Sequence, residues 1–221
     1  MAIKPILFNT EMVRAISDGR KTCTRRIAKV FIPDDALWGY TAFTPKGYIS
    51  CRGLYADGYG EKFYKLPYQP GDILYVRETW QYLYELDGNE QVIEDTGKYY
   101  YAATDTIPFD TYVDENGVTH DHAPWRPSIH MPKEAARIWL KVTNVRVERL
   151  QDITSEQIYR EGTEVEEPFV LNGEEKRYAF SVLWNSTIKK SDLDRYGWDA
   201  NPYVFVIEFV KIDKPEEIQN A

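Results

Sequence analysis

The stretch SDGRKTCTRR, residues 17–26, places four basic side chains and two threonines within ten positions. The chain as a whole is acidic, with a formal net charge of −8 over 221 residues. Residues 1–29 nevertheless contain seven basic residues against two acidic ones. A local positive region on a negative protein favours a small anionic or polar ligand, or a short nucleic-acid segment, over long duplex DNA.

A short helix is predicted immediately before the basic stretch, over residues 9–19. Either Asn9 or Thr10 suits the helix N-cap, Val13 and Ile16 lie on one helical face, and Gly19 suits the C-terminal end. The positive charge therefore begins where the helix ends. Basic residues also occur at this end of a helix without any ligand, because they interact favourably with the helix dipole.

A second informative stretch is GDILYVRETW, residues 71–80, which from Ile73 onward alternates like a strand. In the strand phase that buries Leu74 and Val76, Glu78 points inward with them. A carboxylate directed into a core needs a cation or a hydrogen-bond donor as its partner. The basic stretch can supply that partner, and a purely structural pairing of Lys21 with Glu78 is one interpretation of the pattern.

The rest of the chain predicts short strands with a few peripheral helices, in a single α+β domain over residues 1–221. Thr154 and Gln157 have the spacing of a helix-capping box. Strands are predicted over residues 136–150 and 202–212, and helices over residues 153–162 and 177–185.

Residues 81–124 differ from the remainder, because they hold ten acidic residues against Lys98 alone. The turn pairs Asp-Gly at 87–88 and Asn-Gly at 116–117 punctuate this segment. We interpret it as an acidic, hairpin-bearing insertion.

Two motifs together resemble the ASCH domain family of PUA-like small barrels. GRKTCTRR, residues 19–26, matches the family pattern G-x-K-x-x-T-x-R after the first helix, and GDILYVRE, residues 71–78, matches its strand that ends in an acidic residue. WRPSIHMPKEAARIWL, residues 125–140, and WDANPYVFVIEF, residues 198–209, are similar to phage and prophage members of the family.

The resemblance implies a mixed β-barrel with peripheral helices that recognises a nucleoside or a short single-stranded RNA. Small bacterial members of the family are amidohydrolases that deacetylate acetylcytidine with a Lys–Thr–Glu triad. Carried over by motif position, this triad is Lys21, Thr24 and Glu78.

The chemistry agrees with this assignment only if Lys21 can accept a proton. A threonine hydroxyl is a weak nucleophile until a base removes its proton, and a lysine acts as a base only when its pKa is lowered. Neighbouring arginines would lower that pKa, whereas a nearby Glu78 would raise it. Cys23 is a further nucleophile candidate, without a histidine near it in the sequence.

Two other classes of function are compatible with the sequence. The first is a non-catalytic RNA-binding module, in which Lys21 and Thr24 serve recognition only. The second is a phage accessory protein that binds a host protein through residues 81–124.

Further residues are candidates for substrate binding. Arginines, Ser128 and His130 could contact phosphate or polar groups, and tryptophans could stack on a base. Arg126, Ser128 and His130 alternate, so on a strand they would share one face. The full set of these candidates is Arg20, Arg25, Arg26, Trp80, Arg126, Ser128, His130, Trp198 and Asn201.

We predict no cofactor and no metal, because His120 and His122 have no cysteine or glutamate cluster beside them. The sequence shows no leader segment and no apolar run long enough for a membrane helix. Two cysteines fit a reducing compartment. We therefore expect a cytoplasmic protein, in the host cytoplasm if it is phage-encoded.

Overall fold

The structure is a computed structural model of the 221-residue chain. It describes residues 1–29, 32–85, 87, 89, 91, 93, 95–107, 112–113, 118–120, 124–163 and 173–216. Contacts between residues divide the chain into two compact units, each assembled from segments far apart in the sequence. The first unit comprises residues 1–2, 19–72 and 141–210, and the second comprises residues 3–18, 73–140 and 211–221.

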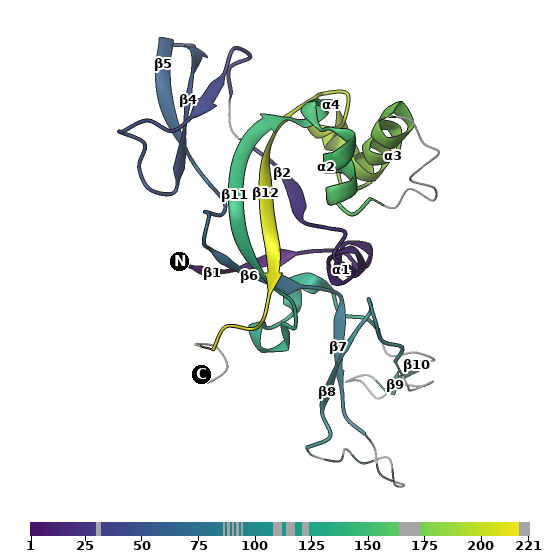
Figure 1. The fold of residues 1–221 in the computed structure, drawn as a ribbon. Helices are drawn as coiled ribbons and strands as arrows, with labels where there is room; N and C mark the ends of the chain where they lie inside the picture. Colours follow the sequence, from purple (N-terminus) through teal and green to yellow (C-terminus); the bar gives the residue numbers. More distant parts are fainter. Residues whose placement is uncertain are drawn as a thin grey trace. The chain divides into compact units, whose positions relative to one another are not determined.

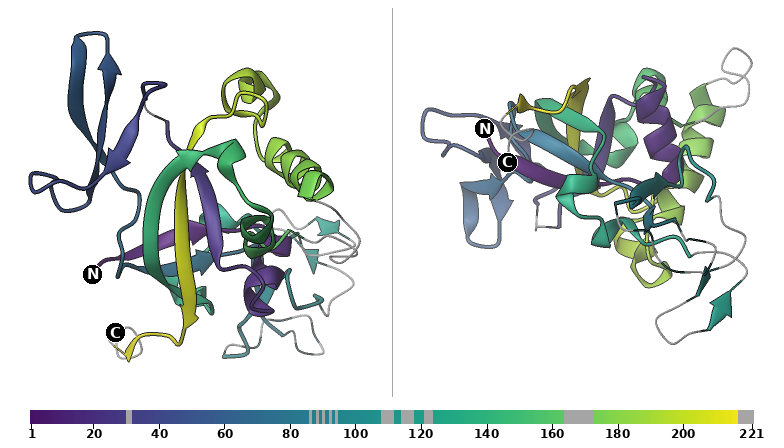
Figure 2. Two further views of the ribbon diagram at one scale, coloured as in Figure 1. Left: turned by 45° about the horizontal axis from the view of Figure 1, so that its top comes forward. Right: turned by 90° about the horizontal axis from the view of Figure 1, so that it is seen from below.

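Three strands of the first unit lie side by side in the order β11, β12, β2 (Figures 1 and 2). They span Trp139–Arg149, Tyr203–Ile212 and Cys23–Ile27. The first two residues of β11 and the last two residues of β12 belong to the second unit. Strands β12 and β2 are antiparallel, with Ile207 opposite Thr24 and Val206 opposite Arg25. The second half of the basic stretch is therefore a strand beside a strongly apolar neighbour.

A separate antiparallel sheet of the first unit has the order β3, β4, β5. These strands span Leu37–Gly39, Tyr48–Tyr55 and Gly58–Lys65. The turn between β4 and β5 places Gly58 at a φ of +114°, which only glycine adopts readily.

The helices of the first unit cover a small apolar core. Helices α2, α3 and α4 span Ser155–Arg160, Gly173–Ser186 and Leu193–Tyr196, and the 3₁₀ turns η3 and η4 span Leu150–Asp152 and Lys190–Asp192. The predicted capping box is confirmed. Gln157 N donates to Thr154 Oγ1 at 3.3 Å, and Thr154 N donates to Gln157 Oε1 at 2.9 Å. The buried core consists of Leu150, Ile153, Ile158, Phe180, Trp184, Val204 and Val206.

In the second unit, strand β1 (Ile3–Leu7) pairs in parallel with β6 (Ile73–Arg77). Helix α1 (Thr10–Ser17) begins where Met12 N donates to Asn9 Oδ1 at 2.8 Å. Two antiparallel pairs follow, β7 (Trp80–Leu83) with β8 (Lys98–Tyr101), and β9 (Tyr112–Val113) with β10 (Thr119–His120).

Two 3₁₀ turns, η1 (Ser128–His130) and η2 (Lys133–Ala135), precede β11. The core of the second unit contains Ile73, Trp80, Met131, Ala135, Ala136 and Trp139. The predicted phase of β6 is confirmed, because Leu74, Val76 and Glu78 are 0%, 0% and 1% exposed. The strand predicted over residues 73–80 is instead two strands, since β6 ends at Arg77 and β7 begins at Trp80.

The predicted α+β class is confirmed, with several sheets and few helices. The strands and helices predicted from residue 136 onward are all present, and each differs by a few residues at its ends. Every sheet among the described residues has two edge strands, so none of them closes into a barrel. Parts of the 81–124 segment lie outside the described residues, including Gly88 and both residues of the Asn-Gly pair.

Candidate functional site

Lys21 and Arg25 are both buried against one carboxylate, that of Glu161. Lys21 Nζ donates to Glu161 Oε2 at 2.8 Å and to the main-chain oxygen of Glu161 at 2.7 Å. Arg25 Nη1 donates to Glu161 Oε1 at 3.0 Å. The side chains of Lys21, Arg25 and Glu161 are 0%, 1% and 6% exposed. The carboxylate therefore compensates two cations whose burial without a partner would be very unfavourable.

Helix α2 positions this carboxylate. Glu161 is the C-cap residue of α2, four positions after Gln157, so the two side chains lie on one helical face. Arg25 Nη2 donates to Gln157 Oε1 at 3.0 Å and to Glu148 Oε1, on β11, at 2.5 Å. We refer to Lys21, Arg25, Glu148, Gln157 and Glu161 as the Glu161 cluster.

Further charged side chains surround the Glu161 cluster. Arg146 donates to Glu148 at 2.9 Å and to Glu208, on β12, at 2.6 Å. Arg160 Nε donates to Thr22 Oγ1 at 3.1 Å. Acidic residues from later in the chain therefore compensate much of the positive charge that stands out in the sequence.

Thr24 has a different environment from Lys21 and Arg25. By the alternation of strand residues, Thr24 and Arg26 lie on one face of β2, and Cys23 and Arg25 lie on the other. Arg26 Nη1 donates to Thr24 Oγ1 at 2.8 Å, and Thr24 is 1% exposed. The Thr24 hydroxyl has no acceptor within the described part of the chain. This buried hydroxyl therefore accepts one hydrogen bond and keeps its own hydrogen for another group.

The electrostatics of β2 argue against Cys23 as a nucleophile. Burial, and secondarily Glu161, raise the pKa of the Cys23 thiol to about 12. A thiol that stays protonated is a poor nucleophile. Burial also lowers the pKa of the Arg26 guanidinium from its ordinary value, while Glu161 opposes that effect.

Glu78 belongs to the second unit and forms a bidentate ion pair there. Arg137 Nε donates to Glu78 Oε1 and Arg137 Nη2 to Glu78 Oε2, both at 2.9 Å. The Arg137 guanidinium also lies 4.0 Å from the centre of the Tyr101 ring. Burial raises the pKa of Tyr101 to about 12. The inward carboxylate is thus present as predicted, and its ion-pair partner among the described residues is Arg137.

The candidates between residues 80 and 130 are placed by turns and by the core. Trp80 is 5% exposed and packs with Tyr99, so its ring is not a surface for stacking. Arg126 pairs with Trp80 through main-chain hydrogen bonds of 2.8 and 3.2 Å. The shared face considered for Arg126, Ser128 and His130 required a strand, whereas residues 128–130 make a 3₁₀ turn that follows Pro127. In that turn Ser128 and His130 do not share a face.

The remaining candidates lie in the first unit. Arg20 Nη1 donates to the main-chain oxygen of Gly162 at 3.4 Å. Trp198 borders a cavity beside helix α3. Asn201 has a φ of +45°, and its Oδ1 accepts from Gln151 N at 2.8 Å. Asn201 thus stabilises the turn before β12 and does not line that cavity.

Sequence reasoning missed the carboxylate partners of the basic stretch. Glu148 and Glu161 lie more than one hundred residues after Lys21, in a strand and at a helix end that were both predicted. The only signal in the sequence was the helix register, which places Glu161 one turn after the capping residue Gln157. Arg137, the partner of Glu78, had no such signal.

Neither a metal site nor a membrane helix is found in the described part of the chain. Those residues contain no group of three or more histidine, cysteine, aspartate or glutamate side chains suited to a metal ion. Asp121 and His122 lie outside the described residues. Among the residues described, no helix has both the length and the apolar composition needed to cross a membrane.

Comparisons of the chain with models of protein families, with curated proteins and with solved structures gave no match.

Proposed function

We propose that this chain is an ASCH-like protein that binds a nucleoside or a short single-stranded RNA at Thr24, with the PUA-like architecture that the resemblance implies. The observation that supports this proposal best is that the buried Thr24 hydroxyl accepts from Arg26 and has no acceptor for its own hydrogen among the described residues. A hydroxyl can donate as well as accept, so this hydrogen is available to an acceptor on a ligand. A carbonyl or ring nitrogen of a pyrimidine is an acceptor of the required kind.

The same hydroxyl supports a second candidate, hydrolysis of an acylated cytidine. Thr24 Oγ1 would form a bond to the acyl carbonyl carbon while the bond from that carbon to the exocyclic nitrogen breaks. The threonine proton would pass to a base and then to the leaving amine, and water would cleave the resulting ester. The hydrogen bond from Arg26 would stabilise negative charge that develops on Thr24 Oγ1.

The base in this reaction is Lys21 only if it first loses a proton. Lys21 Nζ donates to Glu161 Oε2 at 2.8 Å, so proton transfer to that carboxylate would leave a neutral amine. In the recognition proposal no such transfer is needed, and Lys21 remains a structural cation of the Glu161 cluster.

Two substitutions at one position separate these proposals. We would incubate acetylcytidine with the wild-type chain, Thr24→Ser and Thr24→Val, and measure released cytidine by mass spectrometry. Thr24→Val keeps the shape of the side chain and removes the hydroxyl, whereas Thr24→Ser keeps the hydroxyl. Thr22→Val is the matched control, because Thr22 contacts Arg160 instead of Arg26. Hydrolysis by wild type, Thr24→Ser and Thr22→Val, but not by Thr24→Val, is the expected result for the enzyme.

Binding measurements decide the recognition proposal when no turnover occurs. Cytidine and a short RNA should bind wild type and Thr24→Ser more tightly than Thr24→Val. An RNA affinity that falls steeply with salt would indicate phosphate contacts and a recognition module. Equal binding by all four proteins would rule out Thr24 as a ligand contact.

A further inference from the structure

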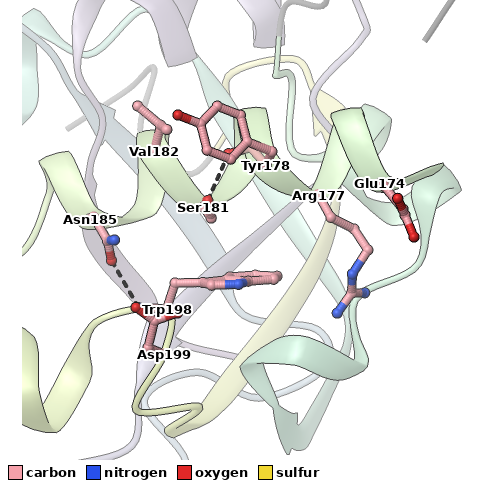
Figure 3. Close-up of a pocket in the computed structure, with 8 residues that line it drawn as sticks. All are labelled: Glu174, Arg177, Tyr178, Ser181, Val182, Asn185, Trp198 and Asp199. Atoms are coloured by element: carbon pink, nitrogen blue, oxygen red, sulfur yellow. Dashed lines mark hydrogen bonds between the residues drawn. The ribbon is translucent and has the colours of Figure 1, made fainter. Parts of the chain in front are cut away.

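A cavity of about 490 Å³ lies between helix α3 and the turn that precedes β12, within the first unit. Figure 3 shows the side chains around it, and Arg177, Tyr178 and Asn185 come from α3 while Trp198 comes from the turn. A volume of this size falls within the ordinary range of small-ligand pockets, about 300–1,000 Å³. The cavity is distinct from the residues of the Glu161 cluster.

The Trp198 ring is a rigid side of this cavity. Trp198 N donates to Asn185 Oδ1 at 2.8 Å, and the main-chain oxygen of Trp198 accepts from Gln151 Nε2 at 2.8 Å. The ring packs edge-on against Phe180, with 6.0 Å between ring centres. A planar side chain held in this way provides a surface on which an aromatic ligand can stack without a large loss of entropy.

Arg177 is also held in place. Its guanidinium lies 5.3 Å from the centre of the Trp198 ring. It donates to the main-chain oxygens of Ile153 and Gln151, both at 2.7 Å. These bonds occupy much of the donor capacity of the guanidinium. Arg177 therefore stabilises the cavity wall and has few N–H groups left to bind a phosphate.

Asn185 and Asp199 supply a donor and an acceptor. Because Asn185 Oδ1 accepts from Trp198 N, its Nδ2 group is the donor that remains, and it has no partner in the part of the chain that is described. Asp199, exposed at the cavity, offers a carboxylate acceptor. A ligand that complements both has a ring acceptor beside an amino group. Adenine and cytosine have this edge, whereas uracil has a carbonyl in place of the amine.

The charges at the cavity favour a base over a phosphate. Glu174 and Asp199 are acidic, and Arg177 is the single basic residue of the lining. A phosphate placed here would meet two carboxylates and a guanidinium already bound to main-chain oxygens. A neutral base carries no charge that the two carboxylates would repel.

We propose that this cavity is a binding site for an amino-bearing nucleobase, adenine or cytosine, stacked on Trp198. This proposal does not depend on ligand binding or hydrolysis at Thr24. It assigns the chain a second contact for a nucleoside or for one base of a single-stranded RNA.

Calorimetric titration of the full chain with adenosine, cytidine and uridine tests the proposal. Adenosine and cytidine should bind, and uridine should bind about tenfold more weakly, since one good pair of base contacts discriminates by about 1–3 kcal/mol. Asn185→Asp keeps the acceptor for Trp198 N but replaces the donor, and should weaken adenosine binding by about tenfold or more. Trp198→Phe should retain binding, and Trp198→Ala should lose it.

Two controls keep the test decisive. Tyr178 is 72% exposed, so Tyr178→Ala should fold normally and weaken adenosine binding by removing one wall, even if Trp198→Ala proves unstable. Thr22→Val, at a residue that does not line the cavity and contacts Arg160, should bind adenosine as wild type does, whatever the outcome for acetylcytidine. The proposal is overturned if no nucleoside binds, if uridine binds as well as adenosine, or if Asn185→Asp and Tyr178→Ala have no effect.

Discussion

The ammonium group of Lys21 donates twice to one residue, Glu161, to its carboxylate at 2.8 Å and to its main-chain oxygen at 2.7 Å. The same carboxylate accepts from Arg25, which also donates to Glu148, so two acids balance these two buried cations. A basic stretch that resembles a ligand site in the sequence is thus to a large extent internally compensated. Thr24 and Arg26, on the opposite face of β2, form the part of that stretch which remains suited to a ligand.

Glu161→Gln should destabilise the fold strongly. It removes a carboxylate that pairs with both buried Lys21 and buried Arg25, and breaking a buried ion pair typically costs about 3–5 kcal/mol. Urea unfolding would measure the change in the free energy of unfolding. Glu11→Gln is the matched control, because its pair with Arg14 is largely exposed and should contribute less than about 1 kcal/mol. Similar losses in the two variants would contradict this account.

Gln157→Ala should cost more than Thr154→Ala, although both residues belong to one capping box. Loss of the Thr154 cap should cost about 1 kcal/mol. The Gln157 side chain accepts from Thr154 N at 2.9 Å and from Arg25 Nη2 at 3.0 Å, so its removal affects the helix start and the Glu161 cluster together. Thermal unfolding of both variants measures the difference, and equal melting temperatures would show that the Arg25 contact contributes nothing.

Cys23 should make the protein less stable at high pH. Its folded pKa of about 12 exceeds its ordinary value of 9.0, so above pH 9.0 the unfolded chain loses a proton that the folded chain keeps. The resulting loss reaches about 1.4 kcal/mol per pH unit until the folded thiol also ionises. Cys23→Ala should therefore lose less stability than wild type between about pH 8 and about pH 10. Parallel pH dependences for the two proteins would contradict the prediction.

Glu78 and Arg137 should behave as a coupled structural pair. Either Glu78→Ala or Arg137→Ala leaves a charge without its bidentate partner, and the double variant should lose less than the sum of the two single losses. A double-mutant cycle by urea unfolding should give a coupling of roughly 0.5–3 kcal/mol. Additive losses would show that the pair is not energetically coupled. Loss of acetylcytidine turnover in Glu78→Gln without loss of stability would instead favour the triad implied by the resemblance.

Local signals made much of the fold predictable. Thr154 with Gln157 predicted the start of α2, and the alternation around Leu74 and Val76 predicted the burial of Glu78. These features depend on neighbours within a few residues. The interruption between β6 and β7 was not predictable from alternation, because the residues on both sides of it keep the strand pattern.

The partners in the candidate site were less predictable, because they join residues far apart in the sequence. Lys21 meets Glu161 across a separation of 140 residues, and Arg137 meets Glu78 across 59. Carboxylates are abundant in an acidic chain, so charge alone does not select among them. The positions of Ser128 and His130 were not predictable either. Their period-2 spacing places them on one face only in a strand, and the chain forms a 3₁₀ turn after Pro127.

The division of the chain between its two units means that some contacts can form only late in synthesis. The chain passes from one unit to the other five times, at residues 2–3, 18–19, 72–73, 140–141 and 210–211. Strand β2 is made early, but β12, its hydrogen-bonded neighbour, is among the last segments to emerge. Lys21 and Arg25, the buried cations of the basic stretch, likewise wait for Glu161, which is made 140 residues after Lys21. A nascent chain halted before Glu161 should keep Lys21 open to amine-reactive labels, and the full-length chain should protect it.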